Sequence, residues 1–206
     1  MPDSPWPVIH AERQALADDL AGLTDEQWNA PSLCAGWTVH DVLGHMVSTA
    51  RMTPPRFLGH FAGAGFNFDR MVAKDIATET AGGPAATLAA FREVTSRTTA
   101  PPGPVDAMLG ELMVHPEDIR RPLGIAHDYP IDAVVRTLDF FKKSNLIIGS
   151  KSRVAGVRLR ATDADWSYGD GPEAAGPAHA LLMAMTGRKA ALADLSGDGV
   201  AVLSAR

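Results

Sequence analysis

The chain has 206 residues, of which 46% are hydrophobic and 21% charged, a composition typical of a globular protein with a hydrophobic core. Its 19 basic and 24 acidic side chains give a formal charge of −5, which argues against nucleic acid or a membrane as partner, because both favour a basic face. No apolar run is long enough to span a bilayer, and the single cysteine, Cys34, excludes an internal disulfide. Since the acidic, proline-rich start is unlike a signal peptide, we expect a cytoplasmic protein.

The first two thirds of the chain carry apolar residues at helical spacing. Thr38, followed three residues later by Asp41, predicts a helix start, because the threonine hydroxyl can accept a hydrogen bond from the Asp41 backbone N–H. Pro116 directly follows His115 and disfavours a helical conformation there, so that helix should end at His115 or continue with a kink. The expected helices span residues 7–20, 39–52, 67–82, 85–98, 105–115 and 131–145.

Beyond residues 149–152, interpreted as a linker, the pattern changes to strand periodicity. Residues 154–162 and 165–169 are predicted to be strands, 178–195 a helix, and 200–203 a last strand after a glycine turn. This predicts two domains, a helical bundle over 1–150 and a small α+β unit over 151–206. The second is too short to be stable alone and should dock on the bundle.

Glu111 and His115 are four residues apart, so a helix presents their side chains one turn apart on one face. A carboxylate and an imidazole so placed can bind one divalent cation, with His45 of an earlier helix as the best third ligand. This set suits Zn²⁺, Ni²⁺, Fe²⁺ or Mn²⁺ and leaves coordination positions open for water or substrate. The alternative is that His45 is a packed histidine and Glu111 and His115 a surface pair.

Three further residues have two interpretations each. Cys34 precedes a Gly-Trp turn and is taken as an inert packing residue rather than a nucleophile. Asp118 either orients His115 or is an exposed cap or salt-bridge partner of a neighbouring arginine. Arg188 either binds a carboxylate through its planar guanidinium or is a surface arginine at a helix end.

Two segments resemble motifs of the mycothiol-dependent maleylpyruvate isomerase family. Residues 32–45 contain its Cys-x-Gly-Trp-Thr signature, residues 111–124 its Glu-x-x-x-His motif, and 160–172, 187–188 and 197–203 are similar to its C-terminal unit. The resemblance implies an α+β, mainly α fold, a DinB-like four-helix bundle with an extra helix and a small C-terminal α+β unit. It also implies that His45, Glu111 and His115 bind the metal through which they act in catalysis. Apart from the resemblance, Arg188 is the candidate residue for binding the cofactor through its guanidinium.

The family further implies a divalent metal, zinc foremost, and mycothiol or a similar low-molecular-weight thiol. Because a metal ion lowers the pKa of a bound thiol, the thiol could attack a small electrophile as a thiolate. The predicted function is therefore a metal- and mycothiol-dependent isomerase or transferase, acting as a monomer or homodimer. Two alternatives remain: a non-catalytic metal- or ligand-binding DinB-like protein, and a metal-dependent hydrolase.

Overall fold

The computed structural model describes residues 4–145 and 148–206, so the first three residues of the proline-rich start lie outside it. The chain divides into two compact units, one ending at His127 and the other running from Asp128 to Arg206. The sequence placed this division at residue 150. The helix over Ile131–Phe141 instead belongs to the C-terminal unit, where it packs on a later helix of that unit.

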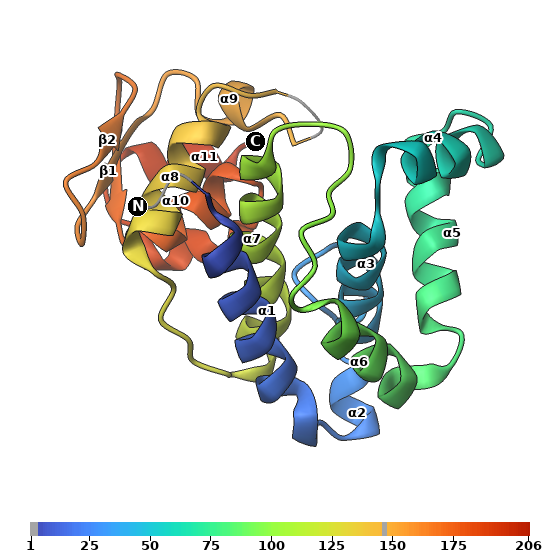
Figure 1. Ribbon diagram of the computed structural model, residues 1–206. Helices are drawn as coiled ribbons and strands as arrows, with labels where there is room; N and C mark the ends of the chain where they lie inside the picture. The colour runs from blue at the N-terminus through green and yellow to red at the C-terminus, as the bar shows by residue number, and fades with distance from the viewer. Residues whose placement is uncertain (1–3, 146–147) are drawn as a thin grey trace. The chain divides into compact units, whose positions relative to one another are not determined.

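The N-terminal unit is a bundle of long helices that pack side by side (Figure 1). Its interior is filled by fully buried apolar side chains such as Leu16, Leu43, Phe91 and Leu109. Within it α3 packs against α5, α6 and α7, and α1 packs against α6 and α7, which gives the mainly helical bundle that the sequence predicted. The elements are α1 (Trp6–Asp19), η1 (Leu20–Gly22), α2 (Asp25–Trp28), α3 (Val39–Arg51), α4 (Pro54–Gly63), α5 (Phe68–Thr80), α6 (Gly83–Val94) and α7 (Val105–Leu123).

The start of α3 is fixed by the cap that the sequence predicted. Thr38 Oγ1 accepts a hydrogen bond of 3.1 Å from the Asp41 backbone N–H, and the Asp41 carboxylate accepts one of 2.9 Å from the Thr38 backbone N–H. These two bonds satisfy N–H groups that the first helical turn leaves without partners. Since the apolar face of α3, with Val42 and Leu43, is buried in the bundle, the position of His45 on α3 is fixed as well.

The helix that carries Glu111 and His115 does not end at His115. It is α7, which passes through Pro116 and ends at Leu123, where Gly124 adopts a left-handed cap with φ 68°. Pro116 removes one backbone hydrogen-bond donor. The turn that follows is nevertheless buried against the bundle, which stabilises the helical path. Glu111 and His115 therefore lie within continuous helix, and their four-residue spacing holds.

The C-terminal unit contains a three-stranded sheet with β1 in the centre. β1 pairs antiparallel with β2, where Leu159 faces Tyr168, and parallel with β3, where Leu159 faces Ala174. β3 was not predicted, because its sequence lacks an apolar–polar alternation. The elements are α8 (Ile131–Phe141), α9 (Ser150–Arg153), β1 (Arg158–Ala161), β2 (Ser167–Tyr168), β3 (Glu173–Gly176), α10 (Ala178–Met185), η2 (Lys189–Asp194) and α11 (Gly199–Ser204).

Three expectations for this unit were wrong. Residues 200–203 form part of the helix α11 rather than a strand, since the buried positions are Gly199 and Leu203, which have helical spacing. The helix expected over 178–195 breaks at Gly187, whose φ of 94° is left-handed. Residues 150–153 form the short helix α9 rather than a linker.

Among the helices that the structure describes, none combines the length and the apolar character that crossing a lipid bilayer requires.

Replacing Thr38 with alanine should lower the free energy of unfolding by about 1 kcal/mol, because the Asp41 N–H loses its cap acceptor. Urea unfolding of the full chain measures this difference. Thr38→Ser keeps the hydroxyl and is the control, expected to remain close to wild type. Equal stability of Thr38→Ala and wild type would contradict the role given to the cap.

Candidate metal centre

The structure brings together the three residues that the sequence selected as metal ligands. Glu111 Oε2 lies 3.3 Å from His45 Nε2 of α3 and 3.5 Å from His115 Nε2, one turn further along α7. The potential ligand atoms of the three side chains all lie within 4.8 Å of one another. The two imidazole rings approach edge to face, with centroids 5.0 Å apart. His115 thus faces His45, as the predicted site requires.

This geometry fits a divalent ion. When metal–nitrogen and metal–oxygen bonds are about 2.0–2.1 Å long, neighbouring ligands of a tetrahedral ion are roughly 3.3 Å apart. The separations of 3.3 and 3.5 Å around Glu111 Oε2 match this value. Two imidazoles and one carboxylate are also a common donor set for zinc in catalytic sites. A fourth position would remain for a ligand from outside the chain.

The other ring nitrogen of His115 is held by Asp118. His115 Nδ1 lies 2.9 Å from Asp118 Oδ2, and Asp118 has no solvent exposure. Because a carboxylate only accepts, Nδ1 donates the proton, and in the neutral ring the Nε2 lone pair is directed toward Glu111. Of the two interpretations of Asp118, the exposed cap is therefore wrong, and the contact with His115 is present.

Cys34 belongs to the surroundings of the site, which the sequence did not reveal. Its Sγ donates to Asp118 Oδ2 at 3.0 Å and lies 3.7 Å from His115 Nδ1. Cys34, His115 and Asp118 therefore form a second group of potential ligands, which shares His115 with the first. In this second group the thiol and the ring are already hydrogen-bonded to one carboxylate oxygen. The first group, His45, Glu111 and His115, is the one that the sequence predicted.

Charge around His115 strongly favours its protonated form in the metal-free protein. Burial by itself lowers the pKa of His115. Glu111 and the hydrogen bonds with Asp118 and Cys34 outweigh burial and raise that pKa to about 10. At neutral pH the ring consequently carries a proton that a metal ion must displace.

Arg13 of α1 is a buried cation that sequence reasoning missed. Its Nη1 donates to the carbonyl oxygens of Val94 at 3.2 Å and Arg97 at 2.8 Å, at the end of α6. Burial lowers the pKa of Arg13 to about 10, although the charge of Glu111 opposes this shift. The helical spacing of the sequence could have predicted that Arg13 is buried, because it lies four residues after Ile9 and three before Leu16, which are both buried.

Arg188 is in the C-terminal unit, directly before η2. It is half-buried, and its Nη1 donates to the carbonyl of Thr186 at 3.1 Å. The cofactor-binding role suggested by the sequence stays a prediction.

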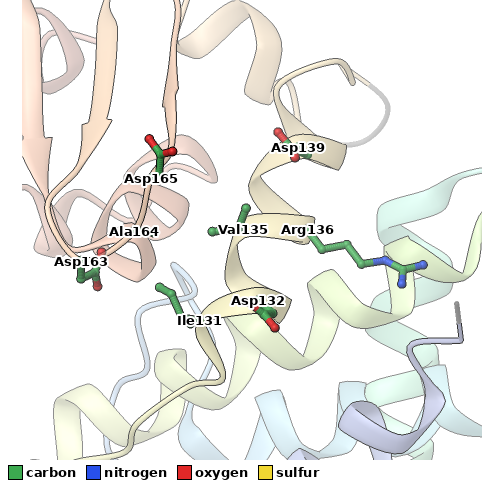
Figure 2. Close-up of a pocket in the computed structure, with 8 residues that line it drawn as sticks. All are labelled: Ile131, Asp132, Val135, Arg136, Asp139, Asp163, Ala164 and Asp165. Carbon is green, nitrogen blue, oxygen red and sulfur yellow. The ribbon is translucent and has the colours of Figure 1, made fainter. Parts of the chain in front are cut away.

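A second feature of the C-terminal unit is an acidic hollow of about 540 Å³ beside α8. Figure 2 shows Asp132 and Asp139 on α8, and Asp163 and Asp165 on the segment that follows β1. Two of these carboxylates have structural partners: Asp139 accepts from Lys142 and Trp166, and Asp163 from the Ala178 backbone N–H. The hollow contains none of the predicted ligands, and we assign it no function.

The fold is that of a DinB-like helical bundle joined to a small α+β unit. The chain belongs to the mycothiol maleylpyruvate isomerase family, since the sequence model of that family's N-terminal domain matches residues 9–139. This confirms the resemblance seen in the two motifs.

Two solved structures share the fold over 94% of this chain and 91% of theirs. One is the mycothiol-dependent maleylpyruvate isomerase, with a TM-score of 0.61 and 14% identity. The other is a histidine-to-alanine mutant of the mycothiol-dependent maleylpyruvate isomerase, with a TM-score of 0.65 and 15% identity. At this identity the similarity confirms the fold class and nothing finer. No curated protein matches the sequence.

Because His115 holds a proton in the metal-free protein, metal binding at neutral pH should release about one proton per chain. The apparent metal affinity should then rise about tenfold per pH unit between about pH 6 and 8. Calorimetric titration of chelator-treated protein with zinc, in buffers of different ionisation enthalpy, counts the protons. An affinity that does not change with pH would contradict the protonation assigned to His115.

Proposed function

We propose that this protein is a metal- and thiol-dependent isomerase or transferase that uses mycothiol, or a similar low-molecular-weight thiol, on a small electrophile. One observation carries the proposal: His45, Glu111 and His115 converge at distances that suit a tetrahedral ion in a chain of the mycothiol maleylpyruvate isomerase family. Zinc is the foremost metal for this donor set, and nickel, iron and manganese are compatible with it. A thiol kept reduced by its surroundings also favours a cytoplasmic location.

Each ligand has a distinct part in the proposed chemistry. A divalent ion, when bound, would lower the pKa of a thiol so that it reacts as a thiolate at neutral pH. Glu111 supplies the only negative charge among the three ligands, and His45 and His115 are neutral donors. The site therefore keeps the net positive charge that attracts a thiolate. Asp118 holds the proton on His115 Nδ1 and leaves Nε2 as the donor.

The electrophile determines which reaction follows. With a cis double bond next to a carbonyl group, the thiolate adds to the alkene carbon remote from the carbonyl, the π electrons move onto the carbonyl oxygen as an enolate, and the former double bond becomes a single bond that can rotate. Return of the electron pair from the enolate then restores the double bond in the trans geometry and expels the thiolate unchanged. With an epoxide or a carbon that carries a leaving group, the sulfur remains on the product, and the reaction is a transfer. The solved relatives named for maleylpyruvate make that compound the first substrate to test.

The metal claim is tested by zinc affinity. His45→Ala and Glu111→Gln should each lower the affinity by on the order of 100-fold or more, since each removes a ligand. Competition with a chromophoric chelator measures the affinity, and circular dichroism verifies the fold of each variant. His60→Ala is the matched control, because His60 pairs with Asp75 away from the site. A wild-type protein that binds no zinc would overturn the proposal.

The enzyme claim is tested by turnover of zinc-loaded protein with mycothiol and a panel of electrophiles that begins with maleylpyruvate. We expect turnover that requires both metal and thiol and that falls in His45→Ala to the level of the metal-free wild type. Turnover without thiol would indicate the hydrolase instead. Metal binding with no turnover on the whole panel would favour the non-catalytic binding protein.

A further inference from the structure

We propose that Cys34 is a positioning residue for the metal centre: it anchors Asp118, and through Asp118 it sets the orientation of His115. This inference rests on the proposed metal site. It gives the sole cysteine of the chain a role that is neither nucleophile nor ligand.

Two donors meet at one carboxylate oxygen. Cys34 Sγ lies 3.0 Å and His115 Nδ1 2.9 Å from the same atom, Asp118 Oδ2, while the two donors are 3.7 Å apart. The carboxylate is fully buried and cannot exchange these bonds for water. Because both donors reach the same oxygen, a rotation of the Asp118 side chain that moves Oδ2 would break both bonds. The thiol therefore limits the motion of the group that orients the ring.

The loop that carries Cys34 is itself bound to α7. The Leu33 backbone N–H donates to the carbonyl oxygen of Asp118 at 3.1 Å. The loop therefore binds both the main chain of Asp118, through Leu33, and its side chain, through Cys34. Within the loop, Cys34 N donates to Ser32 Oγ at 3.1 Å, and Trp37 N donates to the Cys34 carbonyl at 3.0 Å. These bonds fix the position of Sγ relative to α7.

The same loop contacts the other histidine. The Trp37 ring lies 5.2 Å from the His45 ring, between centroids, at an interplanar angle of 48°. One short segment, residues 32–37, therefore supports His45 directly and His115 through Asp118. Because α3 and α7 each supply one imidazole, a support shared by both rings fixes the angle between them, which a tetrahedral site requires.

The competing assignment makes Cys34 a ligand together with Asp118 and His115. In that case His115 would coordinate the ion through Nδ1. Glu111 and His45 would then not be ligands of the same ion as His115. The two assignments predict different spectra for a cobalt-substituted protein. Thiolate coordination produces an intense near-ultraviolet sulfur-to-cobalt charge-transfer band, whereas a site of two imidazoles and one carboxylate lacks it.

The experiment titrates chelator-treated protein with cobalt and with zinc, for wild type, Cys34→Ala, Cys34→Ser and Asp118→Asn. We expect Cys34→Ala to lower metal affinity about 10-fold and Asp118→Asn by up to about 100-fold. Cys34→Ser keeps a donor and should restore most of the affinity. Ala35→Ser, at an exposed position of the same loop, is the matched control and should bind like wild type.

Thermal unfolding of the metal-free variants separates a loss of fold from a loss of positioning. If Asp118→Asn does not fold, the metal affinities of Cys34→Ala and Cys34→Ser, compared with each other, test whether the thiol positions His115. Equal affinities of wild type and Cys34→Ala, or a sulfur-to-cobalt band in the wild type, would overturn this inference and leave the proposed function intact. A wild type that binds neither metal would overturn both.

Discussion

The structure depends on two carboxylates that α7 places on one face, seven residues apart: Asp118, which is fully buried, and Glu111, which is half-buried. Buried negative charge is costly unless cations or donors compensate it. His115 lies between the two and interacts with both, which raises its pKa to about 10. Arg13 contributes further positive charge from α1. A divalent ion at Glu111 would take over much of this compensation, so the arrangement is suited to exchange a proton for a metal.

The continuity of α7 through Pro116 is what keeps Glu111 and His115 in register, and it is maintained from outside the helix. Beyond the proline, Arg120 is fully buried, and its guanidinium contacts Asp19 of α1 at 2.7 Å. Glu12, also on α1, lies 2.8 Å from His127 in the segment after α7. Because an uncompensated charge in this place would be strongly destabilising, these ion pairs fix α7 against α1. The proposed ligands Glu111 and His115 are thus positioned in part by contacts that α7 makes beyond Pro116.

A fold alone does not specify an activity, and this bundle is a scaffold on which the site determines the chemistry. The family is established by the match over residues 9–139, while the reaction is inferred from the donor set. The position of Cys34 adds a consistent detail. Its thiol is hydrogen-bonded to Asp118 within the protein, and the proposed reaction takes its sulfur from an external thiol.

The sequence by itself determined the features that local rules control: the cap at Thr38 and Asp41, the helical bundle, and the one-turn spacing of Glu111 and His115. The role of His45, Glu111 and His115 as metal ligands stays a proposal. Only the tertiary structure decided the features that depend on distant contacts. Helix α7 continues past Pro116 because the following turn is buried, and residues 200–203 are helical because Leu203 is buried in the C-terminal unit. Cys34 reaches Asp118 across 84 residues of sequence, and no local pattern encodes that contact. Local hydrogen bonds and periodicity act over a few residues, whereas burial and charge compensation act between helices.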